Sequence, residues 1–359
     1  MGQYAKGKIE GRVATILTCL FLLLHPNQSE AQNALSIKGF PPEPPIELLG
    51  NRWFIFLEGA IDSEAPKRFE QYITQNNIPD RSVVYLNSPG GSLNAGIELG
   101  RLFRKYGLST DVGRRSSTSN KRFDIAAGGC YSACSYAFLG GQFRYLTNES
   151  RYGVHQFRST GQERASEGDT QIASAVIVDY IRSMDVDTDL FGLSVSAGPD
   201  GMYEIDKATL ERLNVVNNGR TRPVWTIESG DGRLYLKGQR ITEESGINKF
   251  IIACDNRRTI LFAVFDTLRR ESELMKMPAH SLLIDDQPYP VNAELKQTQN
   301  GLFNVAYKLS PQEISALRRA ETVGVAVRFT HQSPLFLGFE GMRVGDGRQK
   351  LIGMLNQCK

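Results

Sequence analysis

The sequence predicts an α/β domain, with a parallel sheet covered by helices, followed by a β-rich domain of the α+β kind. Residues 51–218 alternate short apolar segments with amphipathic ones, which is typical of parallel strands and their connecting helices. A polar segment at Asn217–Pro223 separates them from residues 222–359, where strand-like segments dominate. A chain of 359 residues with 41% hydrophobic and 23% charged residues suits two globular domains and excludes a disordered, collagen-like or coiled-coil protein.

The first 31 residues are expected to be a secretory signal peptide. Basic residues precede an apolar run at Val13–Leu24, and Ser29, Glu30 and Ala31 offer a small-x-small cleavage site. The run is about 12 residues long, too short for a comfortable membrane span, although an uncleaved membrane anchor is the alternative. The mature chain, residues 32–359, is then exported without a membrane span. It would be periplasmic in a Gram-negative bacterium and extracellular otherwise.

The α/β domain is expected to begin after a Pro-rich lead-in at residues 32–50, where Phe40–Pro45 is stiff and extended. Ser63 is a candidate cap for the first helix. In chain order the expected strands are Arg52–Ile61, Ser82–Asn87, Ser109–Gly113, Phe123–Ala127, Phe143–Leu146 and Tyr152–Phe157. The expected helices are Ser63–Asn77, Ser92–Gly107, one starting near Ser132, and Gly168–Asp185.

The β-rich domain is expected to carry two helices among its strands. Ser310 and Glu313 form a capping box with Pro311 at the first helical position, which predicts a helix to about Glu321, and a second helix is expected at Gln349–Leu355. The expected strands are Val224–Glu228, Arg233–Gln239, Phe250–Cys254, Thr259–Phe265, Ser281–Ile284, Leu302–Leu309, Val323–Phe329 and Leu335–Phe339. Substrate recruitment, oligomer assembly and attachment to another envelope component all remain open for this domain.

Export makes disulfides possible in the mature chain, which holds four cysteines. Cys254 and Cys358 both lie in the C-terminal third, and we expect them to pair. Cys130 and Cys134 lie four residues apart at a turn and are either bonded or small buried thiols. The few histidines and the absence of a second closely spaced cysteine pair do not make a metal site, so no metal and no cofactor are expected.

The charge pattern says little about partners. A formal net charge of +3, without a basic stripe interleaved with aromatic residues, excludes nucleic acid as an expected partner. The basic segment Arg114–Arg122 could shape a cleft, bind an acidic partner or be an ordinary solvated loop.

Three segments of the α/β domain hold residues suited to catalysis. Asn87–Gly91 follows an apolar strand and precedes a helix, and its glycines can present backbone N–H groups. Gly128–Cys134 places Ser132 at the start of a helix after a glycine turn, where N–H groups can stabilise an oxyanion. Gly153–Gln156 carries His155, which titrates in the range of a general base for a serine.

Each of these segments also has a plainer interpretation. Asn87–Gly91 could be an ordinary strand-to-helix turn, and Ser132 could simply cap its helix. Ser135 is a rival nucleophile further into the helix. His155 could be a structural, hydrogen-bonded histidine.

Taken together and in this order, the segments resemble the Clp protease proteolytic subunit of the Clp/crotonase superfamily, and in particular its exported branch of Clp-like proteins predicted to be periplasmic. The family's Ser-Pro-Gly-Gly corresponds to Ser88–Gly91, and its His-Gln pair corresponds to His155–Gln156. Its nucleophile corresponds to Ser132, which keeps the family's spacing to Gly141, whereas Ser135 does not. The resemblance covers residues 50–217 and leaves the β-rich domain out.

The resemblance implies a serine endopeptidase, a hydrolase that cuts peptides or unfolded segments without ATP, without a cofactor and as a homo-oligomer. His155 would take the proton from Ser132. The resemblance also implies oxyanion-binding N–H groups at Gly91 and Ala133 and substrate contacts at Ser88, Pro89 and Gly90.

The sequence departs from the family at the third catalytic position. The family's Asp falls on Met202 here, and Asp200 lies two residues away and could serve if the loop bends. Without an orienting acid a triad loses much of its activity. The alternative is therefore a non-catalytic peptide-binding or scaffold protein on the same fold. A third hypothesis is other superfamily chemistry, either acyl-CoA work or a Ser–Lys peptidase using Lys121 or Lys207.

Overall fold

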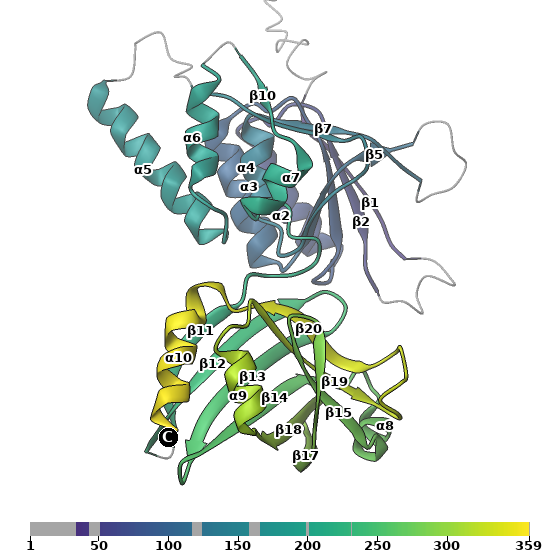
Figure 1. The fold of residues 1–359 in the computed structure, drawn as a ribbon. Helices are drawn as coiled ribbons and strands as arrows, with labels where there is room; N and C mark the ends of the chain where they lie inside the picture. Colours follow the sequence, from purple (N-terminus) through teal and green to yellow (C-terminus); the bar gives the residue numbers. More distant parts are fainter. Residues whose placement is uncertain are drawn as a thin grey trace, which may run out of the picture.

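A computed structural model describes residues 34–42, 51–116, 124–157, 166–198, 201–230 and 232–358. The predicted signal peptide, most of the Pro-rich lead-in and much of the basic segment lie outside these residues. Buried side chains form one cluster between Leu35 and Val216 and a second between Trp225 and Leu355. Figure 1 shows the two parts, here called the N-terminal and C-terminal domains, joined by a single connection. The mixed α/β class predicted from the sequence is confirmed.

The N-terminal domain is built on a sheet with the strand order β1-β2-β3-β4-β8. Four of its strands are parallel, as predicted, because each is an apolar segment whose two faces are covered. The fifth, β1, was assigned to the extended lead-in and instead pairs antiparallel with β2. The strands are β1 (Ser36–Phe40), β2 (Phe54–Glu58), β3 (Val83–Asn87), β4 (Ser109–Val112) and β8 (Arg144–Leu146).

A second, smaller sheet of the same domain carries the catalytic candidates. Its order is β10-β9-β7, with β7 and β9 parallel and β10 antiparallel to β9. An isolated bridge between Ser88 and Cys130 connects the end of β3 to β7. The bounds are β7 (Gly129–Tyr131), β9 (Arg151–Val154) and β10 (Tyr203–Glu204), and a two-stranded pair consists of β5 (Arg114–Arg115) and β6 (Ile125–Ala126).

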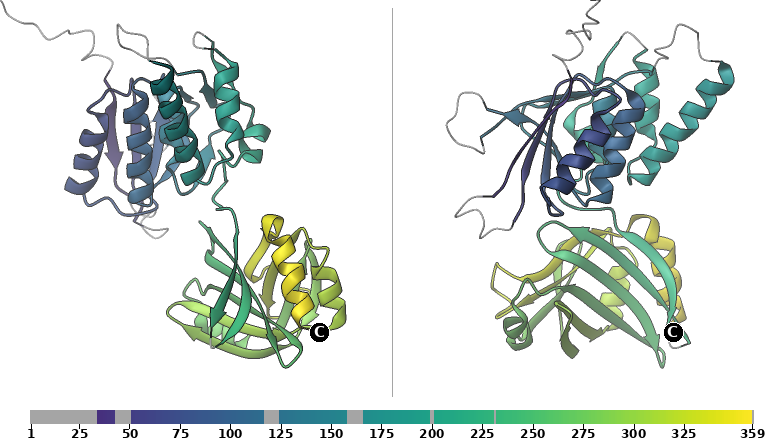
Figure 2. Two further views of the ribbon diagram at one scale, coloured as in Figure 1. Left: turned by 90° about the vertical axis from the view of Figure 1, so that its left-hand side faces the viewer. Right: turned by 180° about the vertical axis from the view of Figure 1, so that it is seen from behind.

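Helices cover the large sheet, with α3 packed between α2 and α4 (Figure 2). The apolar face of α3 that the sequence predicts is buried, and the Phe69 and Phe103 rings of α2 and α3 meet edge to face at 4.9 Å. The helices of this domain are α2 (Ala65–Gln75), α3 (Leu93–Lys105), α4 (Ala133–Leu139), α5 (Glu167–Ser183), α6 (Asp189–Ser196) and α7 (Lys207–Arg212). Among the described residues, no helix is long and apolar enough to cross a membrane.

The prediction that Ser63 caps α2 is wrong. Glu64 is the residue before the helix, and it makes no side-chain cap. The carboxylate of Asp62 instead accepts the Glu64 N–H at 3.0 Å and pairs with Arg68. The hydrogen bond from the Arg68 guanidinium lowers the pKa of Asp62 to about 2. The carboxylate of Asp62, which precedes the helix and is paired with Arg68 in its first turn, thus accepts an N–H at the start of the helix in place of Ser63.

The C-terminal domain contains two antiparallel sheets, with orders β11-β12-β13-β14-β18-β17 and β16-β15-β19-β20. The predicted capping box of Ser310 and Glu313 is confirmed at the start of α9. The strands are β11 (Val224–Gly230), β12 (Arg233–Thr242), β13 (Gly246–Asp255), β14 (Arg258–Asp266), β15 (Ala279–Ile284), β16 (Gln287–Val291), β17 (Ala293–Gln299), β18 (Leu302–Lys308), β19 (Thr322–Arg328) and β20 (Leu337–Arg343). The helices are α8 (Glu271–Lys276), α9 (Pro311–Leu317), η2 (Gly345–Gly347) and α10 (Arg348–Gln357).

A disulfide between Cys254 and Cys358 ties the end of α10 to β13, with the two Cα atoms 5.1 Å apart. At the junction of the domains, Glu243 accepts hydrogen bonds from Arg52 and Tyr145. The bonded cysteines are compatible with an exported protein.

Candidate active site

Ser132 occupies a strained turn between β7 and α4. Its backbone has φ +58° and ψ −122°, outside the conformations that a serine adopts freely, and such strain typically costs about 1–3 kcal/mol. Ser132 precedes the first residue of α4, but its side chain makes no cap hydrogen bond. The plainer interpretation, a helix-capping serine, therefore has no support in the geometry. The sharp strand-to-helix turn resembles a nucleophile elbow.

His155 follows directly after β9 and faces this turn. The parallel pairing of Tyr131 with Gly153, continued by a 3.0 Å hydrogen bond from Ser132 N–H to the Gly153 carbonyl, places the ends of β7 and β9 side by side. As a result His155 Nε2 lies 2.7 Å from Ser132 Oγ. Both residues are only partly buried. The two residues singled out in the sequence are thus hydrogen-bonded partners.

The other ring nitrogen of His155 has no partner. Nδ1 is buried and makes no hydrogen bond within the part of the chain that the structure describes. For Ser132 to donate its proton to Nε2, the imidazole must carry its own proton on Nδ1, and an acceptor there would fix that tautomer. In serine triads this acceptor is a carboxylate.

The neighbouring strand β10 brings Met202 toward the backbone of His155. β10 pairs with β9 so that Tyr203 is opposite Val154, and Met202 is therefore the residue next to His155 across the ladder. The Met202 sulfur lies against Gly153, two residues before His155 and on the same face of the strand. Asp200, the predicted third member, lies outside the described residues. Within the described chain, the side chain at this position is a thioether.

The loop Ser88–Gly91 packs against the Ser132 turn. Ser88 is buried: its N–H donates to the Gly129 carbonyl, its carbonyl accepts from Tyr131 N–H, and its Oγ accepts from Gly90 N–H. All three groups of Ser88 are therefore used within the protein. The neighbouring Pro89 is exposed, and the predicted role of this segment in contacting substrate stays a prediction.

Two glycines let the backbones around Ser132 come this close. Gly90 has φ +103°, and a Cβ there would lie 2.7 Å from the Cβ of Ser132 and 3.1 Å from Ala133 N. On the other side, a Cβ at Gly96 of α3 would lie 2.3 Å from the carbonyl oxygen of Ala133. The start of α4 is thus enclosed between two segments that carry no side chain at the contact.

The predicted oxyanion donors lie beside this contact. Ala133 is the first residue of α4, and an N–H at that position has no acceptor within its own helix. Gly91 is exposed and directly follows Gly90, which borders Ser132 and Ala133. Converging N–H groups stabilise an oxyanion, and this role of Ala133 and Gly91 stays a prediction.

The rival nucleophile Ser135 is buried, and its hydroxyl already donates a hydrogen bond within the protein. It is 1% exposed, its Oγ donates to the Gly153 carbonyl, and its own carbonyl accepts from Tyr152 OH at 2.9 Å. Ser135 therefore joins α4 to β9 and positions the two elements that carry Ser132 and His155.

The far end of α4 is held by two arginines. Arg104 and the fully buried Arg144 both donate to the carbonyls of Leu139 and Gly141 near the end of the helix. Guanidinium groups there satisfy carbonyls that have no partner within the helix. No local sequence pattern predicts these contacts, because the donors come from α3 and β8.

A groove of about 1210 Å³ adjoins the site. It is lined by Ser88, Pro89, Gly129 and Tyr131 on the side of the site, and by residues of β2 and the β8–β9 connection elsewhere. Ser132 and His155 do not line it. Pro89 and Tyr131 therefore mark where an extended ligand in the groove would approach the Ser132 turn.

The described residues contain no group of acidic, cysteine or histidine side chains that could hold a metal ion. Of the lysines considered for a Ser–Lys pair, Lys121 lies outside the described residues, and Lys207 is exposed at the start of α7.

No protein-family model matches this chain, and the curated proteins contain no match to it. Among solved structures, the chain is similar to the crystal structure of the ClpP protease catalytic domain from Plasmodium falciparum. The TM-score is 0.33 and the sequence identity 15%, over 45% of this chain and 81% of that chain. This similarity is weak.

Proposed function

We propose that the chain is an exported serine peptidase in which Ser132 is the nucleophile and His155 the general base. The observation that carries the proposal is the 2.7 Å contact between Ser132 Oγ and His155 Nε2. The serine lies in a strained turn, and within the described residues its side chain makes no cap hydrogen bond. Peptides and unfolded segments are the proposed substrates, cleaved without ATP. A homo-oligomer is the proposed working form.

The proposed reaction follows the roles of these two side chains. His155 Nε2 takes the proton of Ser132 as Oγ attacks the peptide carbonyl, and the N–H groups of Ala133 and Gly91 would stabilise the resulting oxyanion. His155 then passes the proton to the leaving amine, and an acyl-serine remains. Water, deprotonated by His155, releases the acid and restores the hydroxyl.

The lack of an acceptor for His155 Nδ1 among the described residues bears on the expected rate. A carboxylate at this position stabilises the imidazolium that forms, and its loss typically lowers kcat by about 10⁴. With the described residues alone, the Ser132–His155 pair is expected to act slowly as a dyad. A reactive probe that accumulates a covalent product is therefore a better first assay than substrate turnover.

The test is labelling of the purified chain with a fluorophosphonate, which phosphonylates an activated serine with release of fluoride. We expect one label, located by peptide mapping at Ser132. Ser132→Ala should abolish labelling, and His155→Ala should slow it by about 10²–10⁴-fold, the usual contribution of a general base.

Ser194→Ala is the matched control. Ser194 is buried, and its Oγ donates to the Phe191 carbonyl on α6, away from the turn. We expect this variant to be labelled like the parent chain. Absence of labelling in folded protein, or labelling that survives Ser132→Ala, would remove the proposal.

The second candidate function is a non-catalytic peptide-binding protein on this fold. The observation that favours it is that His155 Nδ1 has no hydrogen-bond partner within the described part of the chain. An unlabelled, folded chain that binds immobilised unfolded protein, and loses that binding when Pro89 and Tyr131 are replaced, would support this function instead.

A further inference from the structure

We propose that the disulfide between Cys130 and Cys134 is a positioning element of the Ser132–His155 pair. It holds the turn in the conformation that brings Ser132 Oγ to His155 Nε2. The catalytic consequence rests on the proposed function, whereas the geometric claim does not.

The disulfide closes a very short loop with Ser132 at its centre. The two cysteines are four positions apart, with Cα atoms separated by 5.2 Å. Tyr131, Ser132 and Ala133 are the residues between them. A covalent link across so few residues restricts the backbone angles of the turn itself far more than the rest of the domain.

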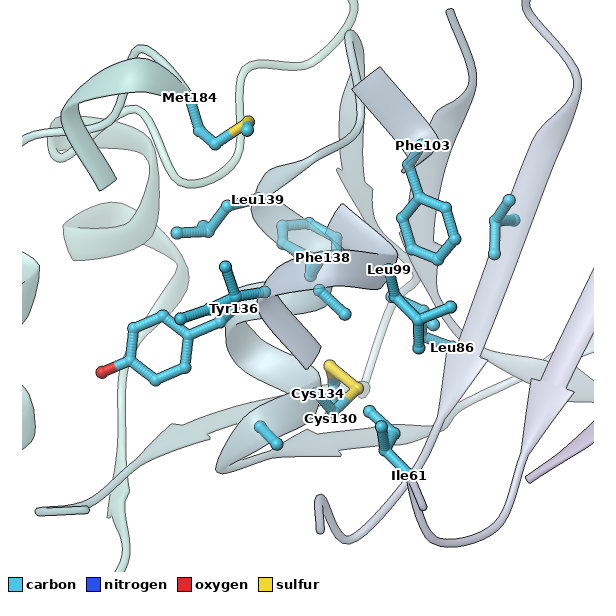
Figure 3. Close-up of a cluster of buried hydrophobic side chains, with 14 of the residues drawn as sticks. Ile61, Leu86, Leu99, Phe103, Cys130, Cys134, Tyr136, Phe138, Leu139 and Met184 are labelled. Carbon is cyan, nitrogen blue, oxygen red and sulfur yellow. A yellow bond between two sulfur atoms is a disulfide. The ribbon is translucent and has the colours of Figure 1, made fainter. Parts of the chain in front are cut away.

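The two ends of the link belong to elements that are themselves fixed. Cys130 is the middle residue of β7 and pairs with Tyr152 on one side and Ser88 on the other. Cys134 lies in the first turn of α4. Both side chains are fully buried, and Figure 3 shows the bond in the hydrophobic core, near Ile61 and below Leu99. The bond therefore ties the small sheet to the helix on either side of Ser132.

Ser132 itself is held by two backbone hydrogen bonds within the described residues. Ser132 N–H donates to the Gly153 carbonyl, and its carbonyl accepts from Ser135 N–H. Its side chain, which would cap an ordinary helix, is turned toward His155 instead. Release of the disulfide would let Ser132 relax toward a common capping conformation, in which Oγ accepts from the N–H groups of α4 and leaves His155.

The test compares two double variants, C130A/C134A and the matched control C254A/C358A. All proteins also carry C19A, so that the parent holds only the four cysteines of the two disulfides. Nitrogen-15 NMR of the histidine rings reads the environment of His155 Nε2 at fixed pH, with and without S132A. With the Cys130–Cys134 bond present, we expect S132A to move this resonance, because a hydrogen bond is lost. In C130A/C134A we expect S132A to leave it in place.

Fluorophosphonate labelling is the second readout. We expect the second-order rate constant to fall about 10²-fold in C130A/C134A, the effect of a misplacement of about 1 Å, and to stay unchanged in C254A/C358A. If S132A moves the His155 resonance equally with and without the Cys130–Cys134 bond, the proposal is overturned.

The two failures can be told apart. If the parent chain takes no label, the proposed function fails, but the His155 resonance still decides whether the disulfide positions Ser132. If C130A/C134A does not fold by circular dichroism, the folded parent is reduced with a water-soluble phosphine. Disulfide, phosphine and water give two thiols and the phosphine oxide, and intact mass counts the thiols. The effect of S132A on the His155 Nε2 resonance is then measured before and after reduction. We expect this effect to disappear on reduction, and an equal effect before and after would overturn the proposal.

Discussion

Each domain, in its described residues, holds one disulfide and one histidine hydrogen-bonded to a hydroxyl, yet the surroundings differ. His280 in the C-terminal domain is 2% exposed, with Nδ1 2.8 Å from Tyr307 OH and Nε2 3.2 Å from the Met277 carbonyl. Both of its nitrogens are satisfied. His155 is partly exposed, contacts a serine in a strained turn, and has one nitrogen without a partner. A hydrogen bond between a hydroxyl and an imidazole therefore points to catalysis only when the pair is accessible to a ligand and the second ring nitrogen is not already bound in the core.

The two disulfides differ in the same way. Cys254–Cys358 spans 104 positions and joins the last helix to a sheet, whereas Cys130–Cys134 spans four. The stabilisation that a disulfide provides by restricting the unfolded chain grows with loop length. The long link is therefore suited to stabilising a fold, and the short link to shaping a turn.

The largest effects are expected when each of the two histidines is replaced by glutamine in turn. His155→Gln should slow fluorophosphonate labelling by about 10²–10⁴-fold with little change in stability. His280→Gln should lower the thermal midpoint, because it leaves Tyr307 or Met277 without a partner in the core, while labelling of the folded fraction is kept. Equal loss of labelling in both variants would show that the two sites do not differ in function.

Removal of each disulfide should separate stability from reactivity. C254A/C358A is expected to lose about 5 kcal/mol of unfolding free energy, and C130A/C134A only about 2 kcal/mol, by the loop-length dependence. Guanidinium unfolding followed by tryptophan fluorescence and circular dichroism measures both values. A larger loss for the short link would contradict this assignment of the two roles.

A carboxylate at position 202 should sharpen the difference between the histidines. Met202→Asp places an acid across the strand pair from His155, and we expect labelling to accelerate at least about tenfold, a modest part of the about 10⁴-fold that such an acid supplies in triads. Tyr203→Asp is the control, because successive side chains on a strand face opposite sides. Equal labelling rates in the two variants would show that a carboxylate at position 202 does not reach the His155 ring.

The smallest expected effect is a pH dependence of stability in the C-terminal domain. Burial lowers the pKa of His280 below its ordinary value of 6.5. The unfolded chain therefore takes up this proton first, so stability is fully present above pH 6.5 and falls as the pH drops below it. As the pH drops below 6.5, the thermal midpoint of the parent should fall more steeply than that of His280→Gln. The variant His331→Gln, which changes an exposed neighbour, should follow the parent.

Local signals in the sequence located much of the fold and the pair of residues at its site. The buried parallel strands, α3 and the capping box of α9 follow from apolar periodicity and caps, which are short-range properties. Ser132 and His155 stand out because each follows a glycine or a strand end. Their 2.7 Å contact needs the parallel pairing of β7 with β9, which no local pattern specifies.

The features that escaped prediction depend on partners distant in the chain. β1 forms because β2 offers an edge and because Gly39 N–H donates to Tyr72 OH of α2 at 2.8 Å. β16 contains Pro288 and Pro290, which argue against a strand, yet it lies at the edge of its sheet, where a missing N–H is tolerated. The bonding of Cys130 to Cys134 depends on the angle between β7 and α4.

The glycines that enclose the start of α4 have a consequence for how this protein can change. A side chain at Gly90 or Gly96 would meet Ser132 or Ala133 at less than 3 Å. Any lineage or directed library that diversifies the groove must therefore keep these two positions while it varies Pro89 or Tyr131 freely. More positions are therefore sensitive to substitution than take part in the proposed reaction. A map of tolerated substitutions would locate the site even before a substrate is known.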